Sequence, residues 1–458
     1  MENHKNDTPR EVVQLDSKKS IWAWALYDWA NSAFATTIMA AFIPIFLGEY
    51  WGKGILTEVQ QTQWLGNTNA IASLVVAILA PILGAIADKM GNKKRFLGFF
   101  ALLGSLVTGA LSLLLEGQYK LAMILYGFGI LGFSGANIFY DAILVGVASE
   151  KKIDYVSSLG YAIGYIGGGL LFTLNAVMYI APGLFGIQNE IRAIQWAFVS
   201  VMVWWIIFSI PLFIRVKEPP VAEKLKYTQA IKGGFRQLWE TLKDIKHLKY
   251  VGIFLLAFWL YIDGVDTIIR MALDYGTALA EQGQIEDLAA TDLAIILLMV
   301  QYIAFPATLL FNLFAKKIGT KKGILIAIGG YMGITVFGYF ITAKWQFFII
   351  GGAIALFQGG IQALSRSAYS RLIPEGKSAQ FYGFFNMLGK FAAVVGPFLM
   401  ATITGATGNH RLGLLSLLIL FGLGFILLLF VDFEKGEKMA REYLGKGELI
   451  KDGKLVGE

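Results

Sequence analysis

The sequence is poor in the residues that build most metal, redox and nucleophilic sites. It contains no cysteine, which excludes disulfide bonds, thiolate metal ligands and a thiol nucleophile. Its three histidines, His4, His247 and His410, all lie outside the apolar runs. An imidazole relay or a haem inside a membrane is therefore excluded, and we expect no metal site and no cofactor.

Motifs for nucleotide binding and for nucleophilic catalysis are also missing. The glycines at 167–169 resemble part of a phosphate loop, but no strand precedes them and no Gly-Lys-Ser/Thr ending follows. A Ser/His pair cannot form inside the membrane without an intramembrane histidine. We expect the protein not to be an enzyme, not to use ATP and not to bind nucleic acid, so any transport must draw on an ion or solute gradient.

Charge is scarce, whereas apolar residues are abundant. Charged residues make up 16% of the 458 residues and hydrophobic ones 56%, and the mean hydropathy is +0.60. A soluble protein would carry about 25% charge. Apolar windows of about 20 residues, enough for a helix to cross a bilayer, predict an all-α membrane protein with twelve spans. These spans lie near residues 21–47, 65–87, 96–115, 121–147, 156–180, 194–214, 250–273, 292–315, 323–343, 345–370, 380–404 and 411–432.

Lysine and arginine gather in the loops that follow even-numbered spans, and the loops after odd-numbered spans have few. By the positive-inside rule, this predicts that both termini are cytoplasmic. The expected organisation is a cytoplasmic tail (1–20), a six-helix half (21–214), a basic linker (215–249), a second six-helix half (250–432) and a cytoplasmic tail (433–458). Within the linker, the apolar residues at 235, 238, 242 and 245 predict either an amphipathic helix on the anionic inner leaflet or a solvated segment with a chance apolar stripe.

The two halves repeat each other. Residues 84–94 align without gaps with residues 312–322, and each segment closes the second span of its half. Residues 133–136 align in the same way with residues 357–360 in the fourth spans. Parallel six-span repeats are typical of transporters that bind a solute between the halves near the membrane midplane.

Three ionisable residues form a polar stripe on the seventh span. Asp263, Asp266 and Arg270 are spaced i, i+3 and i+7, which places them on one helix face. Each costs about 2.5–3.5 kcal/mol near the middle of a membrane, so the stripe must face partners or water. Asp266 and Arg270 are spaced for a structural ion pair. Asp263 has no evident partner in its own helix, and we expect it to lie in the cavity beside Trp259 and Tyr261.

Lys390 of the eleventh span lies about 15 Å inside the membrane, too deep to reach the surface easily. We expect it to lie in a central cavity, where it binds a substrate carboxylate or acts as a counter-charge to Asp263. The alternative is a structural pair that locks the seventh and eleventh spans together. Other polar residues that we expect to line this cavity are Asn31, Asn137, Gln358, Gln362 and Asn386.

Asp28 in the first span and Asp141 in the fourth lie toward the predicted cytoplasmic side, where each could serve the cavity, an inner gate or a structural pair. Arg366 of the tenth span follows the position that aligns with Asp141. We therefore expect an Asp141–Arg366 or an Asp28–Arg366 ion pair to close the inner gate.

The segment Gly84-x-x-x-Asp88-Lys89-x-Gly91-x-Lys93-Lys94 resembles the loop signature of the major facilitator superfamily and lies in the same place, between spans two and three. The resemblance implies a gate latch, with Gly84, Asp88, Gly91, Lys93 and Lys94 as its residues. The basic residues would also serve orientation alone. In the second copy, Asn312 and Lys316 replace the glycine and the acid, so we expect only the turn and the charges to remain there.

Two more stretches narrow the resemblance. Residues 27–34 (YDWANSAF) and 358–367 (QGGIQALSRS) are similar to the vacuole-effluxer branch of that superfamily, whose fungal members export amino acids from the vacuole. The resemblance implies the major facilitator fold, with spans one, four, seven and ten around the cavity.

We therefore expect a monomeric transporter in a lipid bilayer that moves a small polar or zwitterionic solute by alternating access, either coupled to protons or as an effluxer. Amino acids and short peptides fit a cavity that offers both charge signs. A sugar, nucleoside or drug transporter, or a receptor of this fold without flux, remains an alternative. The expected membrane is the plasma membrane of a prokaryote, or the vacuolar membrane of a eukaryote.

Overall fold

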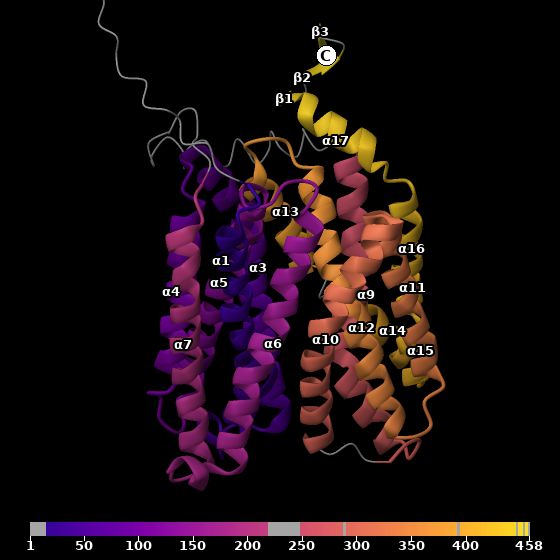
Figure 1. Ribbon diagram of the computed structural model, residues 1–458. Helices are drawn as coiled ribbons and strands as arrows, with labels where there is room; N and C mark the ends of the chain where they lie inside the picture. Colours follow the sequence, from indigo (N-terminus) through magenta and orange to yellow (C-terminus); the bar gives the residue numbers. More distant parts are fainter. Residues whose placement is uncertain are drawn as a thin grey trace, which may run out of the picture.

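The computed structural model describes residues 15–218, 248–286, 290–391, 394–445, 448–451 and 454–456. In these segments, twelve helical stretches are long and apolar enough to cross a membrane. Figure 1 shows them as two groups of upright helices, one from the indigo-to-magenta part of the chain and one from the salmon-to-yellow part. The predicted all-α architecture with twelve spans is confirmed.

The first half begins with a span that is only partly α-helical, because it continues as π-helical segments that widen the turn. Its elements are α1 (Lys18–Ala33), η1 (Phe34–Phe42), α2 (Ile43–Phe46), η2 (Leu47–Trp51), α3 (Glu58–Met90), α4 (Lys93–Leu111), α5 (Tyr119–Ile143), η3 (Leu144–Gly146), α6 (Ile153–Ile180), η4 (Pro182–Phe185) and α7 (Glu190–Arg215).

The second half has a span that is divided in two, formed by α13 and α14. Its elements are α9 (Lys249–Glu281), α10 (Ala290–Ile318), α11 (Thr320–Tyr339), α12 (Trp345–Arg371), α13 (Ser378–Phe391), α14 (Val395–Thr407), α15 (His410–Leu415) and α16 (Leu417–Leu429). The amphipathic helix predicted in the linker falls on residues outside the described segments.

The C-terminal tail contains a helix and short strands. It begins as α17 (Phe433–Glu442) and continues as three short strands, β1 (Tyr443–Gly445), β2 (Glu448–Lys451) and β3 (Lys454–Val456). The strands pair antiparallel in the order β1-β2-β3. Strands of three or four residues are too short to show a clear alternating pattern in the sequence.

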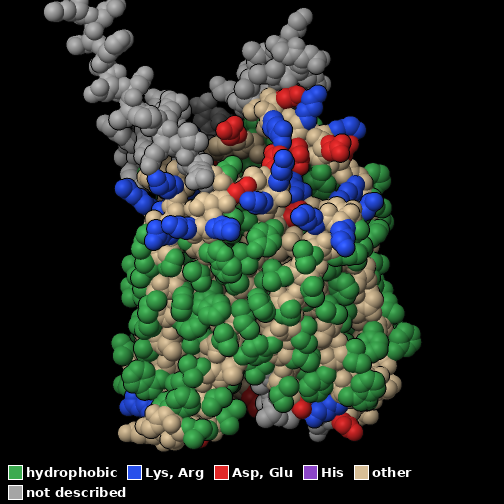
Figure 2. Space-filling model, in the orientation of Figure 1, with side chains coloured by type: hydrophobic (Ala, Val, Ile, Leu, Met, Phe, Trp, Pro, Cys, Tyr) green, Lys and Arg blue, Asp and Glu red, His purple; other side chains and the backbone are tan. Residues whose placement is uncertain are grey.

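Figure 2 shows an apolar band across the visible face of the bundle, with lysine and arginine gathered at the end where α17 lies. We call this end the basic end, and it includes Lys93, Lys94, Lys321 and Arg371. The opposite end, where α6 meets η4, is the far end. A broad apolar belt between two polar ends is the surface of an integral membrane protein.

Glycines allow the helices of the first half to approach closely. A Cβ atom at Gly160 would lie 2.6 Å from Oδ2 of Asp28, and one at Gly164 would lie 2.8 Å from Oγ of Ser32. Gly167 and Gly168, which resembled part of a phosphate loop, face Trp29 and Ser32 in the same way, so this stripe is a packing surface for α1. This contact fixes the position of Asp28 in the centre of the protein.

The two halves meet through α3 and α13 at the basic end. A Cβ atom at Gly84 of α3 would lie 2.1 Å from the carbonyl oxygen of Ala379, and one at Gly383 of α13 would lie 2.6 Å from that of Ala80. Both helices therefore require glycine on their facing surfaces.

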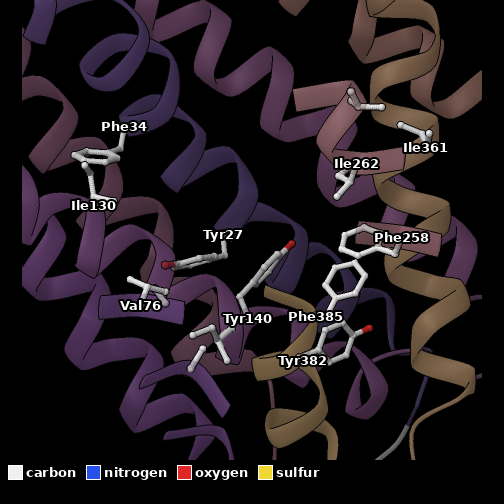
Figure 3. Packing of buried hydrophobic residues seen from close by; sticks show 14 of the residues in the cluster. Tyr27, Phe34, Val76, Ile130, Tyr140, Phe258, Ile262, Ile361, Tyr382 and Phe385 are labelled. Carbon is white, nitrogen blue, oxygen red and sulfur yellow. The ribbon is translucent and has the colours of Figure 1, made fainter. Parts of the chain in front are cut away.

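Aromatic side chains fill the layer beneath this crossing. Figure 3 shows Tyr27 and Tyr140 of the first half on one side and Phe258, Tyr382 and Phe385 of the second half on the other. The rings of Phe258 and Phe385 stack with their centroids 4.0 Å apart, which joins α9 to α13.

Candidate functional site at the interface of the halves

Arg366 of α12 is the central charge of the interface, and only 2% of the residue is exposed. Its Nη1 donates to Oδ1 of Asp141 on α5 at 3.1 Å. Its Nη2 lies 3.5 Å from Oδ2 of Asp28 on α1. The same guanidinium donates from Nε to the hydroxyl of Ser157 and from Nη2 to its carbonyl, both at 2.9 Å. A side chain of the second half is thus bound by three helices of the first.

Both carboxylates that the sequence offered as alternatives therefore contact Arg366. The faces of Trp24, Tyr140 and Tyr161 surround its guanidinium, with 5.0, 5.4 and 4.2 Å from Cζ to the ring centroids. Aromatic faces attract a cation most strongly where water is excluded. They compensate part of the cost of burying the charge.

Neighbouring groups hold the two carboxylates in place. The hydroxyl of Tyr140 donates to Oδ2 of Asp28 at 2.8 Å. The amide of Asn386 on α13 donates to Oδ2 of Asp141 at 3.0 Å. When both acids are ionised, two negative charges face one positive charge, so the cluster carries one excess negative charge in a buried place.

The loop signature between α3 and α4 forms a second contact between the halves. Asp88 accepts hydrogen bonds from the backbone amides of Ala379 at 3.1 Å and Gln380 at 2.8 Å, the first turn of α13. A carboxylate at a helix N-terminus satisfies orphan amides and the helix dipole. Lys93 pairs with Asp88 at 2.9 Å and donates to the hydroxyl of Ser378 at 2.7 Å.

The other residues of the signature act within the first half. Gly91 ends α3 with φ of 59°, a left-handed conformation that favours glycine. Nζ of Lys94 donates to the carbonyl oxygens of Phe213 and Val216, and its backbone amide donates to Glu218. The contact between Lys94 and Glu218 joins the start of α4 to the residues that follow α7.

The second copy of the signature lacks the acid, and the opposite half supplies one. Asp154 at the start of α6 accepts from Arg371 of α12 at 2.8 Å and from the hydroxyl of Thr320 at 2.7 Å. Sequence reasoning missed this contact because it treated the charges at the ends of the spans as orientation signals. The only available signal was that Lys316 stands where an acid would be needed.

The amides expected to line the cavity lie on several helices. Asn31 donates to Asn137 at 2.6 Å within the first half. Gln362 of α12 accepts from the hydroxyl of Tyr165 on α6 at 2.9 Å, across the interface. Oε1 of Gln358 is buried and has no hydrogen-bond partner among the described residues. A buried amide oxygen without a partner is a candidate contact for a polar solute.

Two expected cavity residues on α9 have other neighbours. Tyr261 is fully buried, and its hydroxyl lies 2.6 Å from that of Ser365, so it joins α9 to α12 within the second half. Its place in the cavity therefore stays a prediction. Trp259 is partly exposed, and its Nε1 is buried without a partner.

The polar stripe on α9 also differs from expectation. Asp263 is 1% exposed and accepts from Thr267 of its own helix at 3.3 Å, so it does have a partner there. Among the ion pairs formed by the described residues, none joins Asp263 to Lys390. Lys390 is partly exposed and lies within electrostatic range of Asp266 and Arg270 instead. Asp266 and Arg270 approach to 3.9 Å.

The halves also touch toward the far end. Nε2 of Gln301 on α10 donates to the hydroxyl of Thr36 at 2.8 Å, and the hydroxyls of Thr173 and Tyr302 lie 2.8 Å apart. These contacts involve neutral groups, whereas those toward the basic end involve buried charges. The strongest connections between the halves are thus at or near the basic end.

Sequence comparison assigns the family. The family model described as "Vacuole effluxer Atg22 like" matches residues 16–63, 56–153 and 146–441. The chain belongs to this family. It is 36% identical to the uncharacterized MFS-type transporter YxiO of Bacillus subtilis over 421 residues, which cover 92% of this chain and 96% of the relative. Autophagy-related protein 22 of Kluyveromyces lactis is 24% identical over 481 residues, covering 93% and 96%.

Solved structures show the same fold. The major facilitator superfamily transporter FucP in the outward conformation aligns with a TM-score of 0.65 at 13% identity, covering 90% of this chain and 98% of that one. The proton:xylose symporter XylE aligns with a TM-score of 0.64 at 15% identity, covering 90% and 94%. The family member described here is thus an integral, multi-pass transporter of the major facilitator fold and not an enzyme.

Proposed function

We propose that the protein moves a small polar or zwitterionic solute, an amino acid or a short peptide, by alternating access. The observation that carries this proposal is the burial of Arg366 from one half between Asp28 and Asp141 of the other. While this contact is formed, it holds the two halves together at one end of the protein. Rocking of the halves must separate the charges, and a gate of this kind opens and closes as a unit.

The basic end is the cytoplasmic end in this proposal, because lysine and arginine favour that side. The structure then corresponds to a state closed toward the cytoplasm. The family description as vacuole effluxers supports export as the direction, and a proton gradient is the proposed driving force.

A zwitterion suits the charges on the second half. Lys390 and Arg270 offer positive groups for a carboxylate, and Asp266 offers a negative group for an amine. Lys390 forms no hydrogen bond or ion pair with any other described residue, so its ammonium group is available to a solute. Gln358 and Gln362 add neutral hydrogen-bonding groups on α12.

A ligand screen tests the substrate class. Purified protein is heated with amino acids, dipeptides, sugars and nucleosides, and ligands that raise the unfolding temperature are then assayed for flux in proteoliposomes. We expect an amino acid or a dipeptide to raise the unfolding temperature. We expect Lys390→Ala to lower the affinity for that ligand at least tenfold. Lys438→Ala, an exposed site on α17, is the matched control.

Stabilisation by sugars or nucleosides alone would contradict the proposed substrate. Binding without flux in proteoliposomes would instead favour a receptor of the same fold.

A further inference from the structure

Asp263 lies where the eleventh span is divided into α13 and α14. Helix α13 ends at Phe391, and α14 begins at Val395. The backbone amide of Gly396, in the first turn of α14, donates to Oδ1 of Asp263 at 2.9 Å. The neighbouring amide of Val395 also interacts with this carboxylate. The carboxylate thus binds the N-terminus of a 13-residue helix inside the membrane.

The contact is too close for any residue but glycine. A Cβ atom at position 396 would lie 2.0 Å from Oγ1 of Thr267 and 2.7 Å from Oδ1 of Asp263. The first turn of α14 therefore packs directly against the polar face of α9. Any change at the carboxylate acts on the start of α14 without an intermediate side chain.

The second carboxylate oxygen of Asp263 has no partner in the described part of the chain. This atom, Oδ2, is buried and accepts no hydrogen bond there, and only 1% of the residue is exposed. An unsatisfied oxygen of a buried acid is costly unless something binds it. A cation is one partner that such an oxygen can bind, because an ionised carboxylate accepts hydrogen bonds or binds cations and has no proton to donate.

No basic side chain in the described residues forms an ion pair with Asp263. In the described residues, the helices packed against α9 near this point place Asp266 and Arg270 on α9 itself, Lys390 on α13, and Tyr331 on α11. The described parts of α14 and α16 contain no charged residue. Arg366 on α12 is occupied by Asp28 and Asp141.

We propose that Asp263 is a binding site for a monovalent cation, a proton or Na⁺, and that its occupation loosens the start of α14. A cation on Oδ2 neutralises the carboxylate, and a neutral group interacts less with the positive end of a helix dipole. The site extends the proposed function by naming where a driving ion binds and which segment responds. Helix α14 forms the outer part of the eleventh span, so its movement would alter the far end of the transporter.

Distances within the second half test the site without a transport substrate. Because the chain has no cysteine, spin labels can be attached at Ala401→Cys on α14 and Ile349→Cys on α12, both toward the far end. Rocking of the halves does not change this distance, so the result is independent of alternating access. The distance is measured by pulsed electron paramagnetic resonance in nanodiscs, in acidic and alkaline choline buffer and then with Na⁺ at alkaline pH.

We expect the distance distribution to shift with acid if the cation is a proton, and with Na⁺ if it is Na⁺. Asp263→Asn should give the shifted distribution under all conditions, because the amide is neutral, like the occupied carboxylate, and responds to neither ion. Asp263→Ala should give the shifted distribution throughout. A label pair at Ile349 and Val336, which excludes α14, should not respond.

A wild-type distribution that ignores both ions would overturn the proposal. Equal responses of wild type and Asp263→Asn would overturn it as well. Asp263→Asn carries this test by itself if the alanine variant does not fold.

Discussion

Replacing Arg366 with alanine is expected to lower the free energy of unfolding by about 3–5 kcal/mol and to abolish flux, because two buried carboxylates lose their shared cation. Asp28 and Asp141 would be left with Tyr140 and Asn386 as their remaining partners. Hydrogen bonds from neutral groups do not balance a buried negative charge. Denaturant unfolding in detergent, followed by flux in proteoliposomes, measures both effects.

Two matched variants show whether the loss comes from the buried charge. Arg371→Ala removes a less deeply buried ion pair with Asp154, which keeps Thr320 as a partner, so we expect a smaller loss of stability than for Arg366→Ala. The triple variant Asp28→Asn/Asp141→Asn/Arg366→Gln removes all three charges together, and we expect it to regain most of the stability without transport. If Arg366→Ala is as stable as the wild type, or no less stable than the triple variant, the central role of this ion cluster is wrong.

Gly84→Ala is expected to open the basic end. The new Cβ atom would meet a backbone carbonyl at 2.1 Å, and a backbone cannot move aside as a flexible side chain can. Helices α3 and α13 must therefore separate, which also strains the bonds from Asp88 to α13. A single cysteine at Ala379, fully buried in the closed interface, should react with a water-soluble maleimide at least tenfold faster in Gly84→Ala than in the Gly84 background.

Gly66→Ala is the matched control on the same helix. A Cβ atom at Gly66 meets nothing within 4 Å, so alanine there is expected to stabilise α3 by up to about 1 kcal/mol through helix propensity. The cysteine should react in Gly66→Ala as it does without either substitution. Equal reactivity in the Gly84 and Gly66 variants would mean that α3 and α13 do not hold the basic end closed.

The sequence could indicate the partners of Arg366 because few groups can satisfy a guanidinium inside a membrane. Asp28 and Asp141 were the acids within reach of the predicted cytoplasmic side, and the internal repeat aligned Asp141 beside Arg366. The sequence could not show that both acids bind the same cation, nor that Tyr161 and Ser157 of α6 complete the site. Those contacts depend on how closely the glycines of α6 allow α1 to approach.

The role of Asp263 could not be predicted, because its partner is a backbone amide. The hydropathy of the sequence predicts one continuous apolar helix for the eleventh span, whereas the structure has two helices there, α13 and α14. The division shifts the residue opposite Asp263 from Lys390 to Gly396. The pattern of side chains in the sequence indicates charge pairs. The position of a helix N-terminus inside the membrane follows only from the folded backbone.

Two distances measured on one protein test the rocking of the halves most directly. Spin labels at Arg95 and Lys317 report the basic end, and labels at Leu184 and Phe340 report the far end; all four side chains are exposed. We predict that Gly84→Ala lengthens the distance at the basic end and shortens the distance at the far end, relative to Gly66→Ala. Distances that both stay unchanged, or that both lengthen, would contradict an alternating-access mechanism gated at the basic end.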